Sequence, residues 1–215
     1  MLERLRAQVA QAEARFRPAP FPVPAELTTV LDGGLKPGAA YSLAAGGALL
    51  LALLAEPSRA GNWCGVVGIP EFGAEAAALA GVALDRLALV PDPGEQWLAA
   101  TAALVEALPV VAVRPIGRVR EADASRLASR LRDRGAVLLV HGPWPRAESL
   151  LTLDDALWAG LGDGYGHLHC REVTVTVRSR QVPAPRSARL VLPTADGRLA
   201  AATVPQRSAA LKAVG

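Results

Sequence analysis

The stretch "AAYSLAAGGALLLALLAEPSRAGNWCGVVGIPE", residues 39–71, decides the fold class. It begins with a short apolar run that is typical of a buried strand and passes through Gly46 and Gly47. It then continues as a leucine-rich run of helical character, and a second apolar run follows from Cys64. Short buried strands separated by helices are typical of parallel β-α-β units, because helices then cover both faces of the sheet.

The same alternation continues downstream. Strands are expected at residues 40–45, 64–69, 86–90, 110–114 and 136–141, and helices at 47–55, 73–80, 94–107 and 121–134. After about residue 168 the hydrophobic period changes to two, and the runs from Arg171, Arg186 and Gly197 indicate an antiparallel meander. The predicted fold class is therefore α/β: a mostly parallel sheet flanked by helices, with a C-terminal antiparallel meander.

The bulk composition indicates a globular protein that resides in the cytoplasm. The chain has 215 residues, 51% of them hydrophobic and 20% charged, which is enough for one well-packed core. Its first residues are charged and amphipathic, unlike a secretory signal, and the uncharged stretch 39–55 is too short to span a membrane. Cys64 and Cys170 are expected to be free thiols.

The N-terminal region has a different pattern from the core. Leu2, Leu5 and Val9 lie at helical spacing and predict a helix with one apolar stripe. Four prolines within residues 17–26 prevent that helix from continuing and indicate an extended tether. The expected division is an N-terminal helix and tether over residues 1–25, a core over 26–207 and a tail over 208–215. The stripe packs either on its own domain or on another chain.

Two features indicate binding surfaces. Residues 171–215 hold eight basic and two acidic side chains, whereas residues 1–170 hold 15 and 18. Such a basic surface attracts phosphates or an acidic protein, and charge alone does not separate the two. Trp144 stands between two prolines beside Arg146, so it is either a core residue or an exposed binding anchor. The arginines proposed for partner binding in the basic region are Arg178, Arg180, Arg186 and Arg189.

A metal site is not expected. His167, His169 and Cys170 lie close together in the sequence, with His141 elsewhere. Structural zinc sites need four ligands at recognisable spacings, and the chain has no Cys-x-x-Cys pair. Ordinary strand positions are the favoured interpretation of these residues.

Several segments in consistent order resemble the RecA-like family, over roughly residues 28–200. The most specific is "PDPGEQ" at residues 91–96, where that family opens a helix. The other matching segments are "VLDGGLKPGAAYSLAA" (30–45), "CGVVGIPE" (64–71), "PVVAVRP" (109–115), "SRLASRLRDRGAVLLVHGP" (125–143) and "RSRQVPAPRSARLVL" (178–192). The resemblance implies a RecA-like core.

Both nucleotide-binding elements of that family are degenerate in this sequence. A phosphate-binding loop needs G-x-x-x-x-G-K-[ST], whereas Gly46 and Gly47 run directly into alanine and leucine. Arg114 stands where the family has its magnesium-directing aspartate and reverses the charge there. Glu71 stands where the family has its water-activating glutamate. We therefore expect no nucleotide cofactor, no catalytic metal and no enzymatic activity.

A RecA-like core without these elements resembles the ImuA-type mutagenesis accessory proteins, and most closely their short ImuA-prime form. The resemblance implies a role in the SOS response to DNA damage, in error-prone translesion synthesis. The implied partners are an ImuB-type Y-family polymerase homologue and a C-family error-prone polymerase, with any DNA contact indirect. It also implies self-association through the N-terminal helix. SulA-type cell-division inhibitors, which bind the tubulin-like division protein, remain an alternative.

Overall fold

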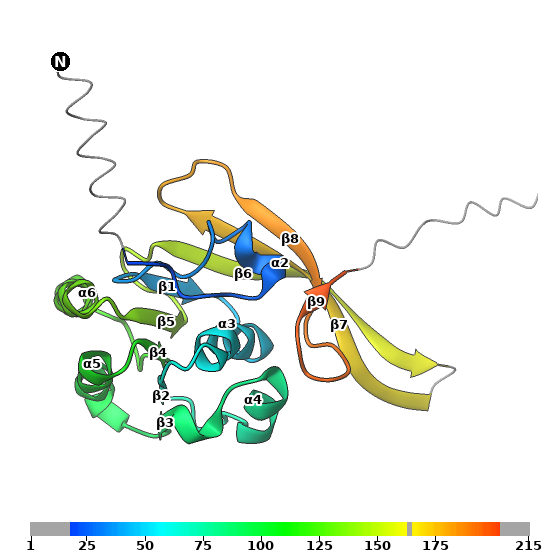
Figure 1. Ribbon diagram of the computed structural model, residues 1–215, viewed down its shortest axis with the longest axis horizontal. Helices are drawn as coiled ribbons and strands as arrows, with labels where there is room; N and C mark the ends of the chain where they lie inside the picture. Colours follow the sequence, from blue (N-terminus) through cyan, green and yellow to red (C-terminus); the bar gives the residue numbers. More distant parts are fainter. Residues whose placement is uncertain (1–17, 163–164, 203–215) are drawn as a thin grey trace, which may run out of the picture.

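The computed structural model describes residues 18–162 and 165–202, and a nine-stranded sheet forms its centre (Figure 1). The strand order is β3-β2-β4-β5-β1-β6-β7-β8-β9. The first six strands run parallel to their neighbours, and β7, β8 and β9 are added antiparallel. The strands are β1 (Ala40–Leu43), β2 (Cys64–Val67), β3 (Leu87–Val90), β4 (Val110–Val113), β5 (Val137–His141), β6 (Ser149–Gly162), β7 (Tyr165–Ser179), β8 (Arg186–Val191) and β9 (Ala200–Ala201).

Helices cover both faces of the parallel part of the sheet. Figure 1 shows α3 and α4 on one face and α5 and α6 on the other. The helices are α2 (Ala25–Thr28), α3 (Ala48–Arg59), α4 (Ala74–Ala80), α5 (Trp97–Ala107) and α6 (Glu121–Arg134), with 3-10 turns η1 (Leu84–Arg86) and η2 (Gly94–Gln96). The α/β fold class with a C-terminal antiparallel meander is therefore confirmed.

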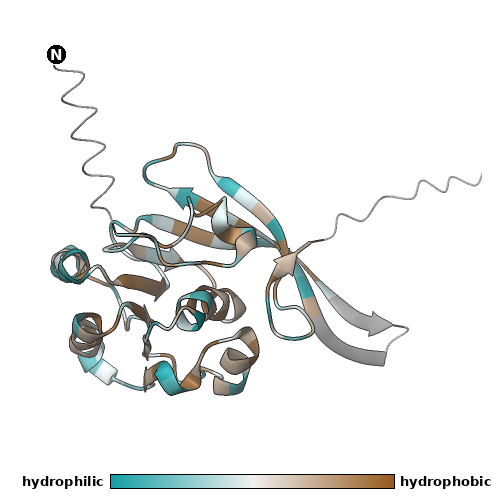
Figure 2. Cartoon of the chain, viewed as in Figure 1, coloured by the Kyte–Doolittle hydropathy of each residue, from teal (hydrophilic) through white to brown (hydrophobic). Residues whose placement is uncertain are grey.

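The hydrophobic pattern of the central strands explains this layering. In β5, Val137 and Leu139 belong to a core cluster with α3, whereas Leu138 and Val140 belong to a second cluster with α5 and α6. A strand that is apolar at every position has two buried faces, because successive side chains point in opposite directions. Figure 2 shows the resulting band of hydrophobic strands between the helices.

One long strand was not predicted. β6 begins at Ser149, lies parallel to β1 and then pairs with β7 over its length. Its alternation is interrupted where the register shifts between Asp154 and Leu157, and Asp155 has a φ of 54°. Two adjacent aspartates are typical of a turn, so the sequence pattern there indicated no strand. The prediction that the period-two region begins only after residue 168 is wrong.

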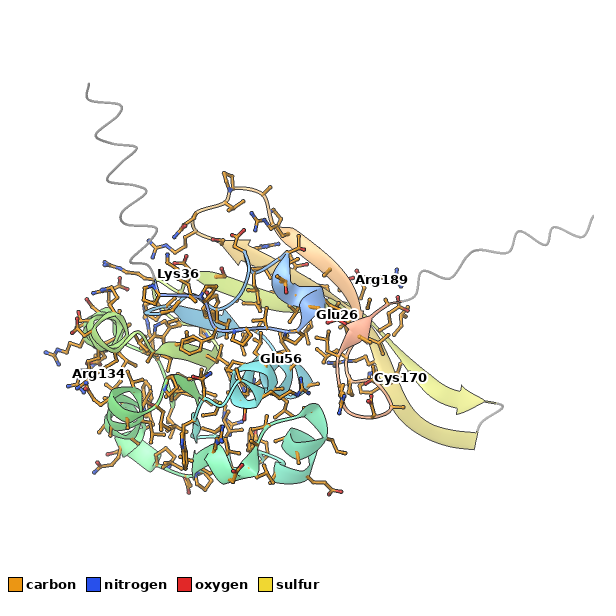
Figure 3. All side chains as sticks on the ribbon, viewed as in Figure 1. Glu26, Lys36, Glu56, Arg134, Cys170 and Arg189 are labelled. Atoms are coloured by element: carbon orange, nitrogen blue, oxygen red, sulfur yellow. The ribbon has the colours of Figure 1, made fainter. Side chains whose placement is uncertain are left out.

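The distal parts of β6 and β7 extend beyond the other strands as a two-stranded ribbon (Figure 1). Pairing between β7 and β8 runs only from Glu172 to Val177, so the remainder of β7 has β6 as its sole paired neighbour among the described strands. Figure 3 labels Cys170 on β7 and Arg189 on β8, the two strands that meet at the base of the ribbon.

The proline-rich segment before α2 lies against the core. Residues 18–24 are extended, as their proline content indicates, but Phe21 and Leu35 exchange two backbone hydrogen bonds of 2.8 and 2.9 Å. Val23 and Leu27 are buried in the same cluster as the inner side chains of β7 and β8. Residues 18–35 therefore cover the inner face of the meander. Leu2, Leu5 and Val9 lie outside the described residues.

No helix within residues 18–162 or 165–202 has the length and apolar character needed to cross a membrane.

Candidate functional site

The carboxyl ends of the parallel strands form the first candidate site, because ligands of open α/β sheets bind at this edge. Four chain segments meet there. They are the β1–α3 loop with Gly46 and Gly47, the loop after β2 with Glu71, the end of β4 with Arg114, and the end of β5 with His141. Three of these four segments, those with Gly46, Glu71 and Arg114, were predicted from the sequence to correspond to a nucleotide site that has become degenerate.

The β1–α3 loop is short and is already occupied by a side chain of the protein. Only four residues separate Leu43 from Ala48, and Gly47 precedes the helix with a φ of 63°, in the left-handed region that favours glycine. A Cβ on Gly46 would lie 2.7 to 3.0 Å from three atoms of the His141 imidazole. The ring therefore lies against the backbone of the loop that corresponds to the expected phosphate cradle.

Arg114 and Glu71 form a bidentate ion pair at the same edge. Arg114 Nη1 donates to Glu71 Oε1, Nη2 donates to Oε2 at 3.0 Å, and Nε donates to the Gly68 carbonyl at 3.1 Å. The hydrogen bond from Arg114 lowers the pKa of Glu71, because it stabilises the ionised carboxylate. Glu71 and Arg114, both named in the sequence analysis, are thus bound to each other. The arginine neutralises the carboxylate that would otherwise attract a cation.

A hollow of about 860 Å³ opens at the same edge, between the segments that follow β4 and β5. His141 and Trp144 line it together with the exposed side chains of Arg118 and Arg120. The position of His141 against the β1–α3 loop was not predicted from the sequence. The glycine pair was the only local sign that another group approaches the loop closely.

Trp144 is not an exposed anchor, so that hypothesis is wrong. Its side chain is 7% exposed and belongs to the core cluster with α5 and α6. The reason is topological: β5 and β6 both flank β1, so residues 142–148 must cross over β1 to connect them. This crossing presses Trp144 onto the sheet. Arg146, two residues later, is exposed and pairs with Glu121 at 2.6 Å.

The four arginines of the basic region differ in their surroundings. Arg178 and Arg180 are exposed. Arg186 forms an ion pair with Asp32, and Arg189 forms one with Glu172. Because paired arginines have a carboxylate beside them already, Arg178 and Arg180 are the stronger candidates for contact with a partner.

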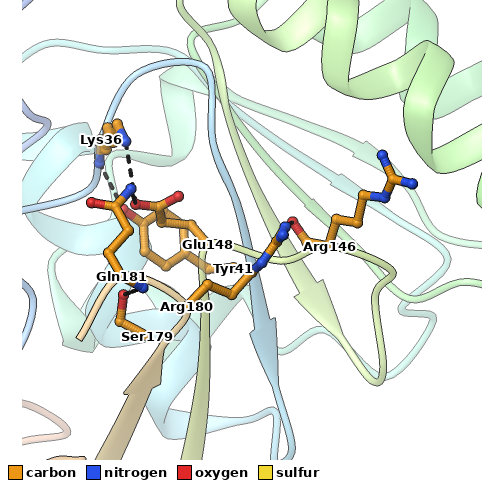
Figure 4. Close-up of polar contacts among 7 residues, drawn as sticks. All are labelled: Lys36, Tyr41, Arg146, Glu148, Ser179, Arg180 and Gln181. Carbon is orange, nitrogen blue, oxygen red and sulfur yellow. Dashed lines mark hydrogen bonds and ion pairs between the residues drawn. The ribbon is translucent and has the colours of Figure 1, made fainter. Parts of the chain in front are cut away.

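A second cluster lies at the opposite, amino edge of the sheet (Figure 4). Glu148 accepts hydrogen bonds from Lys36 Nζ at 3.3 Å and from Gln181 Nε2 at 2.8 Å. The Tyr41 hydroxyl accepts from the Lys36 backbone N–H at 2.8 Å, and burial raises the pKa of Tyr41 to about 12. A neighbouring cleft of about 350 Å³ is lined by these residues and by prolines of the N-terminal segment.

This cluster also brings two predicted residues together. Arg180 donates from Nη1 to the Arg146 carbonyl at 3.4 Å (Figure 4). No motif could have predicted the cluster, because Lys36 and Glu148 are 112 residues apart in the sequence. The hydrogen bonds to Glu148 and to the Arg146 carbonyl join residues 142–148 to the segment before β1 and to the end of β7.

Among the side chains that the structure describes, those of residues 18–158 and 170–202, no three His, Cys, Asp or Glu gather closely enough to hold a metal ion. The side chains of His167 and His169 lie outside the described residues. Burial raises the pKa of the Cys64 thiol to about 12, which keeps it protonated and unreactive at neutral pH.

Replacing Gly46 with alanine tests the contact with His141. We expect Gly46→Ala to lower the free energy of unfolding by about 0.5–1.5 kcal/mol, because the new methyl group forces the imidazole of His141 away from its present rotamer. Adding His141→Ala should recover most of this loss, since the ring that clashes is then removed. Urea denaturation of both single variants and the double variant measures the coupling. If the losses of unfolding free energy in the two single variants simply add in the double variant, the contact between Gly46 and His141 is contradicted.

Comparison with known proteins places this chain in a family. Over 153 residues, it is 34% identical to the uncharacterized protein Rv3395c of Mycobacterium tuberculosis, with 70% of this chain and 74% of that protein covered. Residues 28–146 match the family described as the MT3502 N-terminal domain. That range contains β1 to β5 and therefore every segment that meets at the carboxyl edge. The chain belongs to the MT3502 N-terminal domain family.

Proposed function

We propose that this protein is a non-catalytic RecA-like accessory protein of the ImuA type. In this role it supports damage-induced, error-prone translesion DNA synthesis. It binds an ImuB-type Y-family polymerase homologue and, directly or through it, a C-family error-prone polymerase. The observation that carries the proposal is the carboxyl edge of the sheet, where His141 lies against Gly46 and Arg114 is bound to Glu71.

The geometry of this edge supports a scaffold better than an ATPase. Phosphate binding requires free backbone N–H groups in a loop that can wrap the phosphate chain, and the loop here has four residues and a ring against it. Magnesium requires free carboxylate oxygens, and Glu71 directs both of its oxygens to Arg114. A sheet of ordered strands that is not used to bind phosphate and magnesium is suited to presenting surfaces to partner proteins.

Calorimetry with ATP and magnesium tests the non-catalytic part of the proposal. We expect no binding with a dissociation constant below about 100 µM, which corresponds to roughly −5.5 kcal/mol. Binding would require displacement of His141 and separation of the Arg114–Glu71 pair. An active P-loop ATPase measured under identical conditions is the positive control. Tight binding or measurable hydrolysis would overturn this part of the proposal.

The partner assignment is tested with purified proteins. We expect the full chain to bind the ImuB-type protein of the same organism and not its tubulin-like division protein. The chain that begins at Pro18 should lose this binding, because the stripe of Leu2, Leu5 and Val9 is the expected docking element. Binding to the division protein alone would replace this proposal with the SulA-type alternative.

A further inference from the structure

One face of the antiparallel meander has no covering layer. Val173, Val175 and Val177 of β7 are buried under the N-terminal segment and α3. The alternate side chains of β7 point the other way, and the core cluster on that side of the sheet includes no described residue of β6, β7 or β8. We call this surface the open face. It consists of Leu150, Thr152, Asp154 and Leu157 of β6, Glu172, Thr174, Thr176 and Arg178 of β7, and Ser187, Arg189 and Val191 of β8.

The open face has opposite charges at its two ends. Arg178 lies opposite Leu150, near the start of β6. Asp154 lies opposite Thr174, nearer the ribbon. Among the described residues, Arg178 has no acidic partner within ion-pair distance and Asp154 has no basic one; Asp154 accepts a hydrogen bond from Thr152 at 3.0 Å. The surface therefore carries the arginine Arg178 at one end. At the other end it carries Asp154 beside the Arg189–Glu172 ion pair, which leaves that end acidic on balance.

Apolar groups stand beside these charges on the same face. Leu150 is 36% exposed at the basic end, and Leu157 is 58% exposed at the acidic end, opposite Glu172. Between the two ends the side chains of the open face are short and uncharged, and Thr176 and Ser187 are joined by a hydrogen bond of 3.0 Å. A flat centre of short side chains allows another sheet to approach closely.

We propose that the open face packs against the open face of a second copy of this chain. A twofold axis perpendicular to the strands would run the two surfaces in opposite directions. The end with Arg178 and Leu150 of one copy then faces the end with Asp154 and Leu157 of the other, and Arg178 lies near Asp154 across the interface. A twofold interface requires a self-complementary patch, and this pattern of charge satisfies that requirement. Nucleic acid is a poorer occupant, because Asp154 on the same face repels phosphate and Arg189 is already paired with Glu172. This inference does not depend on the proposed function.

Exchanging the charges of Arg178 and Asp154 tests the interface in the full chain. Sedimentation velocity in low salt should give about twice the mass of one 22.3 kDa chain. Arg178→Asp and Asp154→Arg should each raise the dimer dissociation constant about 100-fold, since each change places like charges at two symmetric contacts. The double variant Asp154→Arg with Arg178→Asp should return the constant to within about tenfold of the original.

The recovery in the double variant is the decisive result. Within one chain, Asp154 lies opposite Thr174, four positions from Arg178 along β7, or about 13 Å. That separation is too large for an ion pair, so recovery requires contact between chains. Arg126→Asp on the exposed side of α6 is the matched control and should leave the constant unchanged. Circular dichroism confirms that each variant is folded.

Three outcomes would overturn the interface. The first is a wild-type protein that stays monomeric at about 100 µM, well above the range of specific dimers. The second is a dimer that dissociates on removal of residues 1–17 but not with either charge variant. The third is a monomer that binds oligothymidine and loses this binding with Arg178→Asp, which would make the open face a nucleic-acid surface. The partner assay with the ImuB-type protein is separate, so its failure is distinguishable from these outcomes.

Discussion

Replacing Trp144 with alanine is expected to lower the free energy of unfolding by about 3–5 kcal/mol, the usual cost of removing a buried large aromatic side chain. The indole is 7% exposed and lies between α6 and residues 142–148, the segment that crosses over β1. Removing it leaves a cavity and loosens the connection that brings β6 to β1. A typical domain is stable by only 5–15 kcal/mol. The variant should therefore be visibly destabilised.

Urea denaturation followed by circular dichroism measures this effect without relying on tryptophan fluorescence. Trp158→Ala is the matched control, because Trp158 is 51% exposed on the ribbon. Its contact with Arg171, 5.2 Å from the ring centre, contributes only about 0.5–1 kcal/mol at an exposed site. Equal losses in the two variants would mean that Trp144 is a surface residue.

Two N-terminal truncations are expected to behave very differently. A chain that begins at Pro18 should melt within about 2 °C of the full chain, since it retains every described contact of the proline-rich segment. A chain that begins at Ala25 loses the two Phe21–Leu35 hydrogen bonds and the buried Val23. At about 1 kcal/mol for each hydrogen bond and 1.5–3 kcal/mol for the valine, it should lose about 3–5 kcal/mol.

Thermal melting followed by circular dichroism compares the two truncations directly. For a chain of this size, the expected loss lowers the melting temperature by roughly 10 °C. Similar melting of both truncated chains would show that residues 18–24 contribute no stability. The same measurement is a control for the partner assay. If the chain that begins at Pro18 stays folded, its loss of partner binding is caused by the removal of residues 1–17 and not by unfolding.

The parallel half of the sheet was predictable because its pattern is local. Each of the strands β1 to β5 is a short apolar run, and the helices between them have apolar residues at helical spacing. The observed strands and helices therefore lie within a few residues of the predicted bounds. "PDPGEQ" behaves as expected for a helix start, since η2 and α5 follow it. The β6 strand was missed because Asp154 and Asp155 interrupt its alternation, and a bulge absorbs that interruption only when β7 lies beside it.

The candidate site was also predictable only in part, and for the same reason. The sequence alone shows that Gly46 and Gly47 are followed by alanine and leucine, not by the lysine and hydroxyl residue of a phosphate-binding loop, and that Arg114 follows the apolar run at 110–113. Which groups stand there instead depends on distant segments. His141 follows the loop by almost a hundred residues, and Glu71 precedes Arg114 by 43, so only the sheet order brings each pair together.

The sequence by itself determined the fold class, the layering of helices on the parallel strands and the departure of residues 39–55 from the phosphate-binding loop motif. These properties follow from hydrophobic period and residue chemistry, which act within a few positions of the chain. Only the tertiary structure decided that Trp144 is buried, that Arg186 and Arg189 are paired, and that the meander has an open face. Burial and pairing are set by which strands are neighbours, and neighbours in this sheet are often far apart in the sequence.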